Sequence, residues 1–255
     1  MNTAATPYGF DLQSESIHDK IASRNLANGS DTDADMLEQL ANHQDFYVRR
    51  AVATHFNTPV TALAKLGNDV EEQIRFYLAA NPNTPVEVLE KLAFNESDDV
   101  RSQVAGNANT SVKVLEELTA DSYVETLRQL VENPMIPANC LQKIANKMLD
   151  IAEKTVLSSL EAAVLRGISV NAKTPAEILE KICAIKNQNN YYWLLSLGVA
   201  QNPQTPDYLL GKLANHDDYD VRLAVAKNSN TPSFVLEKLA ADKEYSIRQT
   251  ATNKI

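Results

Sequence analysis

The chain has 255 residues, of which 44% are hydrophobic, 22% charged and 6% aromatic, and its formal net charge is −9. A chain of this length buries enough surface to fold without disulfides or metal ions, and its two cysteines cannot make a disulfide framework. The acidic balance disfavours a dedicated nucleic-acid binder, and neither a signal peptide nor an apolar run of the roughly 20 residues that cross a bilayer is found. We therefore expect a cytoplasmic protein without a membrane association.

The N-terminal part of the chain precedes any repeated pattern. Residues 1–13 are predicted to be a flexible N-terminus. Residues 14–27 are predicted to form a helix that caps the first unit of a repeat array, since terminal repeats need a cover for their apolar side.

From residue 28 to the end, one phrase recurs. It reads NTPVTALAKL, NTPVEVLEKL, IPANCLQKI, KTPAEILEKI, QTPDYLLGKL and NTPSFVLEKL. The residue before each proline marks the phase, and the markers are Thr58, Thr84, Ile136, Thr174, Thr205 and Thr231, completed by Thr32 and Thr110. Successive markers lie 26, 26, 26, 26, 38, 31 and 26 residues apart. Such regularity indicates a tandem array of eight units.

Each unit predicts two helices. A threonine N-cap followed by proline opens the first helix, and Glu87 and Glu177 stand where a capping box would place them. Leucine or isoleucine recurs five and eight residues after the marker, which makes one apolar stripe. A polar turn and a short second helix with a Val-Arg or Ile-Arg pair follow. The prediction is a single α-solenoid over 14–255, with regular repeats at 28–145 and 202–255 and expanded repeats at 146–201.

The repeated pattern N-x-x-T-P-x-x-x-L-x-x-L-A, then an acidic turn and V-R-x-x-V-A, resembles the leucine-rich repeat variant family and is similar to HEAT-type helical repeats. The resemblance implies an all-α, right-handed superhelix. The period of 26 residues is slightly longer than the family's usual repeat. A family member carries an N-terminal cysteine cluster for an iron–sulfur centre, but residues 1–30 contain no cysteine. We expect no cofactor and no metal.

Two polar residues recur with the repeat, and we interpret both as a structural ladder rather than a ligand-binding track. The asparagine three places before the marker can hydrogen-bond turn amides, and the arginine of the second helix can bridge to acids such as Asp45, Glu71 and Glu244. The predicted ladder residues are Asn81, Asn107, Asn133, Asn171, Asn202, Asn228, Arg49, Arg75, Arg101, Arg222 and Arg248.

The repeat is broken in its two long intervals, which hold twelve and five extra residues. We expect the first to lengthen one or both helices or to add another. The second interval contains the only tryptophan, and Tyr191, Tyr192 and Trp193 are the candidate protein-binding residues. An alternative is that Trp193 packs near a helix start, because it aligns with Phe46, Tyr219 and Tyr245.

No nucleotide-binding, nucleophile-elbow or metalloprotease motif is found, and repeated carboxylates are poor candidates for a unique acid or base. We therefore expect no catalytic, cofactor-binding or metal residues. The predicted function is a non-enzymatic scaffold or adaptor for another protein, which would be basic or polar. Alternatives are a nucleic-acid-binding or DNA-glycosylase-like HEAT protein, and a structural subunit or chaperone of a larger bacterial assembly. The C-terminal end lacks an evident polar cap, which favours self-association there.

The net charge is unevenly distributed. Residues 1–127 hold 9 basic and 20 acidic side chains, a net of −11, and residues 128–255 hold 15 and 13, a net of +2. The argument against nucleic acid is therefore strong for the first half and weaker for the second.

Overall fold

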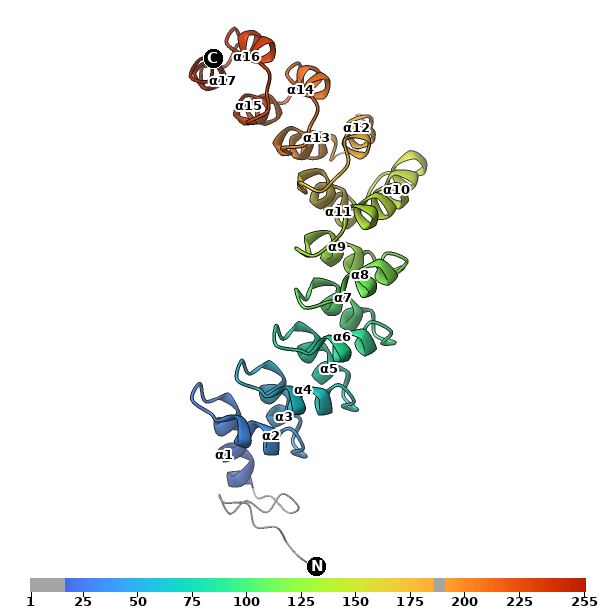
Figure 1. The fold of residues 1–255 in the computed structure, drawn as a ribbon, viewed down its shortest axis with the longest axis vertical. Coiled ribbons are helices and arrows are strands. Elements are labelled where there is room, and N and C mark those ends of the chain that lie inside the picture. The colour runs from blue at the N-terminus through green and yellow to red at the C-terminus, as the bar shows by residue number, and fades with distance from the viewer. Residues whose placement is uncertain (1–16, 186–190) are drawn as a thin grey trace, which may run out of the picture. The chain divides into compact units, whose positions relative to one another are not determined.

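The computed structural model describes residues 17–185 and 191–255. The predicted flexible segment 1–13 lies outside these ranges. Over the described residues every regular element is an α-helix, which confirms the predicted all-α repeat fold (Figure 1). The helices are α1 (Ile17–Asn28), α2 (Ala34–Leu40), α3 (Phe46–Thr54), α4 (Val60–Leu66), α5 (Glu72–Ala80), α6 (Val86–Leu92), α7 (Asp98–Gly106), α8 (Val112–Leu118), α9 (Val124–Glu132), α10 (Ala138–Lys154), α11 (Ser159–Val170), α12 (Ala176–Cys183), α13 (Tyr192–Gln201), α14 (Asp207–Leu213), α15 (Tyr219–Lys227), α16 (Ser233–Leu239) and α17 (Tyr245–Thr252).

The helices belong to two compact units. The first unit contains α1 to α8, together with residues 133–135, and the second contains α9 to α17. In the part of the chain that the structure describes, no helix is long and apolar enough to cross a membrane.

Within each unit, the second helix of one repeat packs against the second helix of the next. This row is α1, α3, α5 and α7 in the first unit, and α9, α11, α13, α15 and α17 in the second. Most first helices pack on the second helix of their own repeat, as α4 does on α5 and α16 on α17. Because α1 packs on α3, it takes the place that the second helix of a preceding repeat would occupy.

The apolar stripe predicted from the leucine spacing forms the core. Leu63 and Leu66 of α4 are fully or almost fully buried, and so are the equivalent side chains of the other first helices. Second helices add valines such as Val48 and Val52. Burying one such side chain stabilises the fold by about 1.5–3 kcal/mol. Because the stripe recurs, every repeat contributes buried side chains to the hydrophobic core that it forms with its neighbours.

The role predicted for the Thr-Pro pair is wrong in one respect. The first helices begin after the proline, and no side-chain hydrogen bond caps α4 or α6. The hydroxyl of the buried threonine instead bonds to a residue that precedes it in the chain. Thr84 Oγ1 donates to the carbonyl of Leu78, six residues earlier, at 2.6 Å. The same bond recurs at Thr58, Thr110, Thr174, Thr205 and Thr231. Threonine therefore closes the end of the preceding second helix, where carbonyls lack helical partners.

The predicted capping boxes at Glu87 and Glu177 are absent as well, because proline occupies the cap position and has no side-chain acceptor. Where another residue replaces proline, a side-chain bond appears: Asp33 Oδ1 accepts from the Met36 N–H at 2.8 Å. A complete capping box opens α11, where Ser158 and Glu161 exchange hydrogen bonds.

The twelve extra residues of the first long interval mainly lengthen α10, which has 17 residues where the other first helices have seven or eight. Its partner α11 has 12 residues against nine in the regular second helices. The extension of α10 forms with α12 a cavity of about 870 Å³, lined by residues that include Leu149, Lys181 and Ile185. The second insertion falls largely on residues outside the described ranges.

Candidate functional site

Within each unit, repeated asparagines form a hydrogen-bonded seam between successive repeats. Asn107 Nδ2 donates to the carbonyls of Ala79 and Asn81, at 2.7 and 2.9 Å, and its Oδ1 accepts from the Asn109 N–H at 2.9 Å. The same three bonds recur at Asn81, Asn133, Asn202 and Asn228. At Asn171 the Oδ1 atom accepts from the Lys173 N–H. These amides are occupied by the protein itself, so the asparagines stabilise the stacking of repeats.

Other residue types hold the two outer places of this seam. His55 stands where the pattern has asparagine, and its Nε2 atom lies 2.9 Å from the carbonyl oxygen of Gly29. In the last repeat, Lys254 Nζ donates to the carbonyls of Ala226 and Asn228, at 3.0 and 2.6 Å. Those carbonyls lie 28 and 26 residues earlier, as in the regular asparagine bonds. The ammonium group of Lys254 thus donates to the two carbonyls that an asparagine amide binds in the regular repeats.

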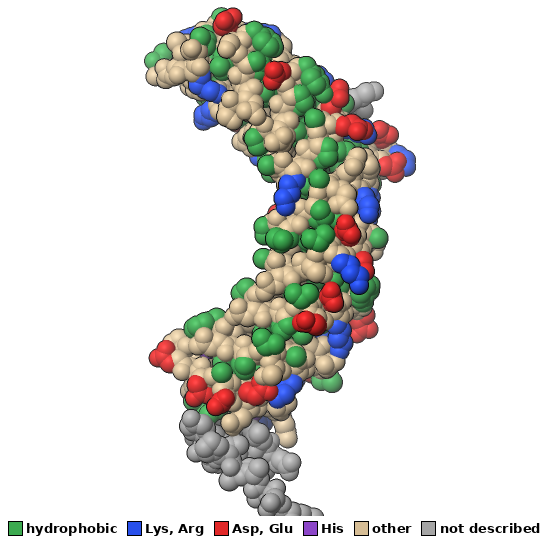
Figure 2. Space-filling model, in the orientation of Figure 1, with side chains coloured by type: hydrophobic (Ala, Val, Ile, Leu, Met, Phe, Trp, Pro, Cys, Tyr) green, Lys and Arg blue, Asp and Glu red, His purple; other side chains and the backbone are tan. Residues whose placement is uncertain are grey.

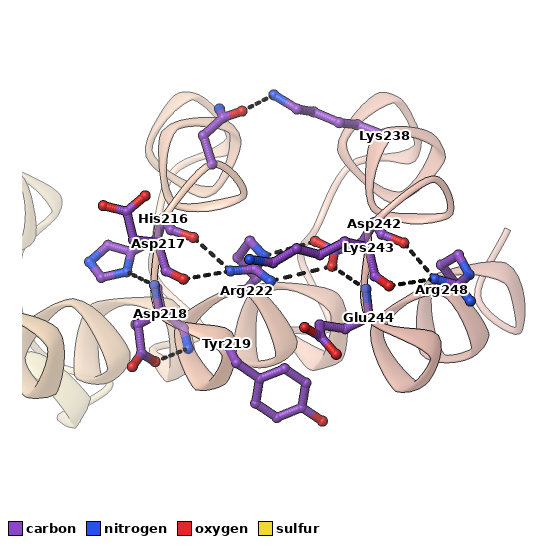
Figure 3. A network of polar contacts seen from close by, with 12 residues as sticks. His216, Asp217, Asp218, Tyr219, Arg222, Lys238, Asp242, Lys243, Glu244 and Arg248 are labelled. Atoms are coloured by element: carbon purple, nitrogen blue, oxygen red, sulfur yellow. Dashed lines mark hydrogen bonds and ion pairs between the residues drawn. The ribbon is translucent and has the colours of Figure 1, made fainter.

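The repeated arginines form a second seam, shown for Arg222 in Figure 3. Arg222 Nη1 donates to the carbonyls of His216 and Asp217, both at 2.9 Å, in the turn before its own helix. Its Nε donates to Asp242 Oδ2 at 2.8 Å, in the turn before the next second helix. Arg49 makes the equivalent bonds, including one of 2.6 Å to Asp69. Arg75, Arg101 and Arg248 hold the carbonyls of their own turns in the same way.

The acidic partners of these arginines differ from most of those that the sequence suggested. Asp69 and Asp242 come from the following repeat, twenty residues along the chain. Asp45, which is nearer to Arg49 in sequence, caps α3 and pairs with Arg24 of α1 at 2.6 Å. Arg49 and Arg222 therefore connect successive repeats, whereas Arg101 pairs with Asp98 of its own helix.

The Arg222–Asp242 pair is well buried and ionised. Burial alone raises the pKa of Asp242, but the hydrogen bonds from Arg222 and from the Glu244 N–H outweigh it, so the pKa lies below its usual value. Charge-assisted bonds of this kind are stronger than bonds between neutral groups.

The seam changes where Ser196 replaces the arginine of α13. Twenty residues later, the place of Asp69 and Asp242 is held by His216. His216 Nδ1 accepts from the Asp218 N–H at 3.0 Å, whereas its buried Nε2 has no hydrogen-bond partner among the described residues. The same exchange of residue types occurs at Ser23 and His43, both buried and also twenty residues apart. Serine and histidine thus replace an arginine–aspartate pair together.

Tyr192 lies against this altered seam. Its ring stacks on the His216 ring, with centroids 4.9 Å apart and planes 24° apart. Burial lowers the pKa of His216, while the negative charges of Asp218 and Asp217 oppose that shift. The stacking gives Tyr192 a packing role between α13 and the turn before α15.

Trp193 is 44% exposed, and it belongs to a row of aromatic side chains. It lies three places before Ser196, as Tyr219 and Tyr245 lie three places before Arg222 and Arg248. Tyr245 is 69% exposed, and Tyr219 is half-buried with its hydroxyl 2.7 Å from Ser246 Oγ. Since α13, α15 and α17 pack in succession, these equivalent positions form one aromatic row: Trp193, Tyr219 and Tyr245.

The structure therefore separates the three predicted contact residues. Trp193 is exposed, Tyr191 is half-buried just before α13, and Tyr192 is stacked on His216. Tyr219 and Tyr245 were not among the predicted contact residues, although their alignment with Trp193 in the repeat was the signal that could have identified them.

Charged side chains of both signs accompany the aromatic row. The exposed Asp220 follows Tyr219 in sequence, and Glu244 stands between the exposed Lys243 and Tyr245. The guanidinium of Arg248 lies 5.8 Å from the centroid of the Tyr245 ring. Figure 3 shows Tyr219 and Glu244 projecting to the same side of the helices, away from the Arg222 seam. The row therefore presents its aromatic rings in a setting of mixed charge.

The first unit carries a different aromatic surface, which the sequence patterns did not reveal. The guanidinium of Arg24 lies 4.5 Å from the centroid of the Tyr47 ring. Arg50 lies 5.4 Å from the same ring and 5.7 Å from Tyr77. Contacts of this kind contribute about 0.5–1 kcal/mol each at exposed sites. They connect side chains of the neighbouring helices α1, α3 and α5.

The first helices carry a mixed-charge surface. Figure 2 shows basic and acidic side chains beside one another on the part of the first unit that carries α2, α4 and α6. Lys65 pairs with Glu38 of the preceding repeat, and Lys91 bonds the side chain of Asn68. Exposed pairs of this kind contribute little to stability, so we interpret this face as solvated.

Both cysteines are free and buried. Cys140 and Cys183 occupy positions held by small hydrophobic residues in other repeats. Burial raises the pKa of the Cys183 thiol, which disfavours the nucleophilic thiolate. Among residues 17–185 and 191–255, no three His, Cys, Asp or Glu side chains gather in a geometry that would hold a metal ion.

Comparisons with known proteins agree with this architecture. Residues 219–244 match the family described as leucine rich repeat variant. A solved structure described as a leucine-rich repeat variant with a novel repetitive protein structural motif is 19% identical, with a TM-score of 0.59; the match covers 98% of this chain and 91% of that one. An archaeal HEAT-like repeats protein from Thermococcus onnurineus NA1 is 13% identical over 94% of this chain and 91% of its own, with a TM-score of 0.32.

No curated protein matches the chain. At 19% identity, the likeness to the solved leucine-rich repeat variant shows the fold alone, while the match at 219–244 identifies the repeat type. Together they agree with the resemblance indicated by the sequence: the chain has an all-α repeat fold like that of the solved leucine-rich repeat variant, and its residues 219–244 match the model of that family.

Proposed function

We propose that the chain is a non-enzymatic scaffold that binds another protein through the second-helix face of its second unit. One observation supports this most directly: three successive repeats place an aromatic side chain, Trp193, Tyr219 or Tyr245, at the start of the second helix. Solenoids use surfaces built from equivalent positions in adjacent repeats for binding. The aromatic row is such a surface.

Aromatic side chains of this kind are effective anchors. Tryptophan and tyrosine are enriched among the residues that dominate binding energy, because they cover a large area with few rotatable bonds. The asparagine and arginine seams hold α13, α15 and α17 in place before a partner arrives. Binding therefore orders little of the scaffold, which keeps its entropic cost low.

The local charge favours a basic or polar partner over nucleic acid. Asp220 beside Tyr219 would attract lysine and arginine side chains and accelerate their approach, while at Tyr245 the charge of Glu244 is offset by Lys243 and Arg248. The Asp220 carboxylate would repel a phosphate backbone, whose neutralisation requires basic side chains. This argument applies to the second unit, where the overall charge left nucleic acid open as an alternative.

Among the three residues predicted from sequence, we assign the contact role to Trp193, with Tyr191 beside it. Tyr192 has an indirect role, because its stacking on His216 holds the start of α13 in place. Replacing Tyr192 would then weaken binding indirectly, by loosening the start of α13, whereas replacing Trp193 would remove contact area.

Affinity capture from the native cell tests the proposal. The full chain is immobilised beside a variant with Trp193→Ala, Tyr219→Ala and Tyr245→Ala, and bound proteins are compared by mass spectrometry. We expect the variant to lose specific partners.

The matched control carries Tyr208→Ala and Phe234→Ala, two exposed aromatic residues of the first helices α14 and α16. It should keep the partners, and circular dichroism should show that both variants are folded. If the triple variant retains every partner of the natural chain, the aromatic row is not the binding surface.

A further inference from the structure

We propose that the first unit has a binding site of its own, in which Arg50 pairs with a single carboxylate of a protein segment beside the rings of Tyr47 and Tyr77. The site belongs to α3 and α5, and it goes beyond the function proposed for the aromatic row of the second unit. The inference follows from how the chain uses its arginines, from the rings beside Arg50 and from the charges of the adjoining helices.

Arg50 differs from the other arginines of the chain in having no polar partner. The chain has nine arginines, all within the described ranges, and eight of them donate hydrogen bonds to its own side chains or carbonyls. Within residues 17–185 and 191–255, the Arg50 guanidinium makes no hydrogen bond and no ion pair, and its nitrogens are not among the buried unpaired atoms. Its planar set of donors, which matches a carboxylate, is therefore accessible to a ligand.

Two tyrosine rings from successive repeats hold this guanidinium in place. Its central carbon lies 5.4 Å from the centroid of the Tyr47 ring and 5.7 Å from that of Tyr77, within the range of a cation–π contact. Each tyrosine packs edge-on against the preceding phenylalanine, Phe46 at 5.2 Å and Phe76 at 5.4 Å between centroids. Because the guanidinium is positioned before a ligand arrives, pairing with a carboxylate costs little side-chain entropy.

The carboxylates closest to this surface in sequence are engaged elsewhere. Asp45 Oδ1 and Oδ2 accept hydrogen bonds from Arg24, at 3.1 and 2.6 Å. Glu72, at the start of α5, accepts from Ser97 Oγ of the next repeat at 2.6 Å. The positive charge of Arg50 is therefore left for a group from outside the unit.

The surrounding charge favours a ligand with one negative charge. Residues 1–127 hold 9 basic and 20 acidic side chains, and α7, which packs on α5, begins with Asp98 and Asp99. Such a surface repels a dianionic phosphate or a nucleic-acid strand more strongly than it repels a single carboxylate. Tyr47 is half-exposed, and its ring offers an apolar contact to an aromatic side chain beside that carboxylate. The ligand is therefore an aspartate or glutamate flanked by aromatic residues.

Nuclear magnetic resonance of the isotope-labelled full chain tests the inference. The probe is the peptide Phe-Glu-Phe with blocked termini, and the Nε–H signals of the nine arginines report which guanidinium binds it. We expect a saturable shift of the Arg50 signal at millimolar peptide. Phe-Gln-Phe lacks the charge and Ala-Glu-Ala lacks the rings, so each should bind at least about tenfold more weakly.

Variants of the chain are compared through the backbone amide signals of Tyr47 and Tyr77. Arg50→Gln should abolish the shifts, and Arg50→Lys, which keeps the charge without the planar donors, should weaken binding at least about threefold. The control Lys113→Gln removes the same charge from an exposed position of the first helix α8, and it should leave the affinity unchanged. Circular dichroism should show that all three variants are folded.

The outcomes decide both the residue and the class of ligand. Equal affinity for Phe-Glu-Phe and Phe-Gln-Phe, or equal affinity of the natural chain and Arg50→Gln, would overturn the inference. The absence of a saturable Arg50 shift, or tighter binding of phenyl phosphate than of Phe-Glu-Phe, would also overturn it. The capture experiment tests the aromatic row of the second unit separately, so either proposal can fail without the other.

Discussion

Arg222 and Asp242 form an ion pair between two successive repeats: Arg222 Nε lies 2.8 Å from Asp242 Oδ2, and the side chains are 6% and 8% exposed. The arginine also binds two carbonyls of its own turn, so one side chain fixes two turns at once (Figure 3). This contact recurs at Arg49 and Asp69 in the first unit. It connects the repeats whose surfaces form the proposed binding row.

Replacing Arg222 should destabilise the second unit strongly. Arg222→Met keeps the apolar stem but leaves the Asp242 carboxylate buried without its partner, which costs about 3–5 kcal/mol. Urea unfolding followed by circular dichroism measures the change. The control, Lys65→Met, removes an ion pair whose side chains are 46% and 29% exposed, and it should cost less than about 1 kcal/mol. Similar losses in the two variants would contradict the assigned role of burial.

The asparagine seam predicts a large difference between two neighbouring asparagines. Asn107→Ala removes two buried bonds to the carbonyls of Ala79 and Asn81, and we expect a loss of about 2–4 kcal/mol in the free energy of unfolding. Asn109→Ala removes an exposed bond to the carbonyl of Pro82 and should cost less than about 1 kcal/mol. Hydrogen exchange would localise the effect, since loss of Asn107 should speed exchange in α5 and α7.

The backward bond of the repeated threonine is tested by two conservative changes. Thr84→Val preserves the shape but removes the hydroxyl that donates to the Leu78 carbonyl, and it should cost about 1–2 kcal/mol. Thr84→Ser retains the hydroxyl and should retain most of the stability. Glu87→Ala should have little effect, because no capping box forms at α6. A large loss with Glu87→Ala would restore the capping role that the sequence suggested.

The stability of the second unit should depend on the protonation of His216. Folding lowers the pKa of this histidine through burial, so the neutral ring is the form that the folded state favours. Its stabilising contribution is complete above the unfolded pKa of about 6.5 and decreases as the pH falls below that value.

The variant that checks this is His216→Asn, because Asn95 holds the same place in another repeat and accepts the equivalent turn bond from the Ser97 N–H. Between pH 7 and pH 5, the free energy of unfolding should fall less steeply in the variant than in the natural chain. Identical pH profiles would show that His216 titrates alike in the folded and unfolded states.

Much of this architecture could be predicted from the sequence. The period of 26 residues identified the repeats, and the leucine spacing identified the buried face, since Leu63 and Leu66 recur in equivalent positions. A repeat makes such inferences possible because equivalent residues share one environment. The lengthening of α10 followed from the helical composition of its insertion.

The tertiary structure alone decided which neighbour each repeated side chain meets. The periodicity shows that Thr84 and Arg222 have equivalent residues in other repeats. It does not show whether their side chains bond to earlier or to later residues of the chain. Thr84 bonds back to Leu78, and Arg222 bonds forward to Asp242, because the stacking of helices sets those distances. The exposure of Trp193 was likewise decided by packing: sequence placed it at a helix start, and only the fold determined that its ring lies at the surface.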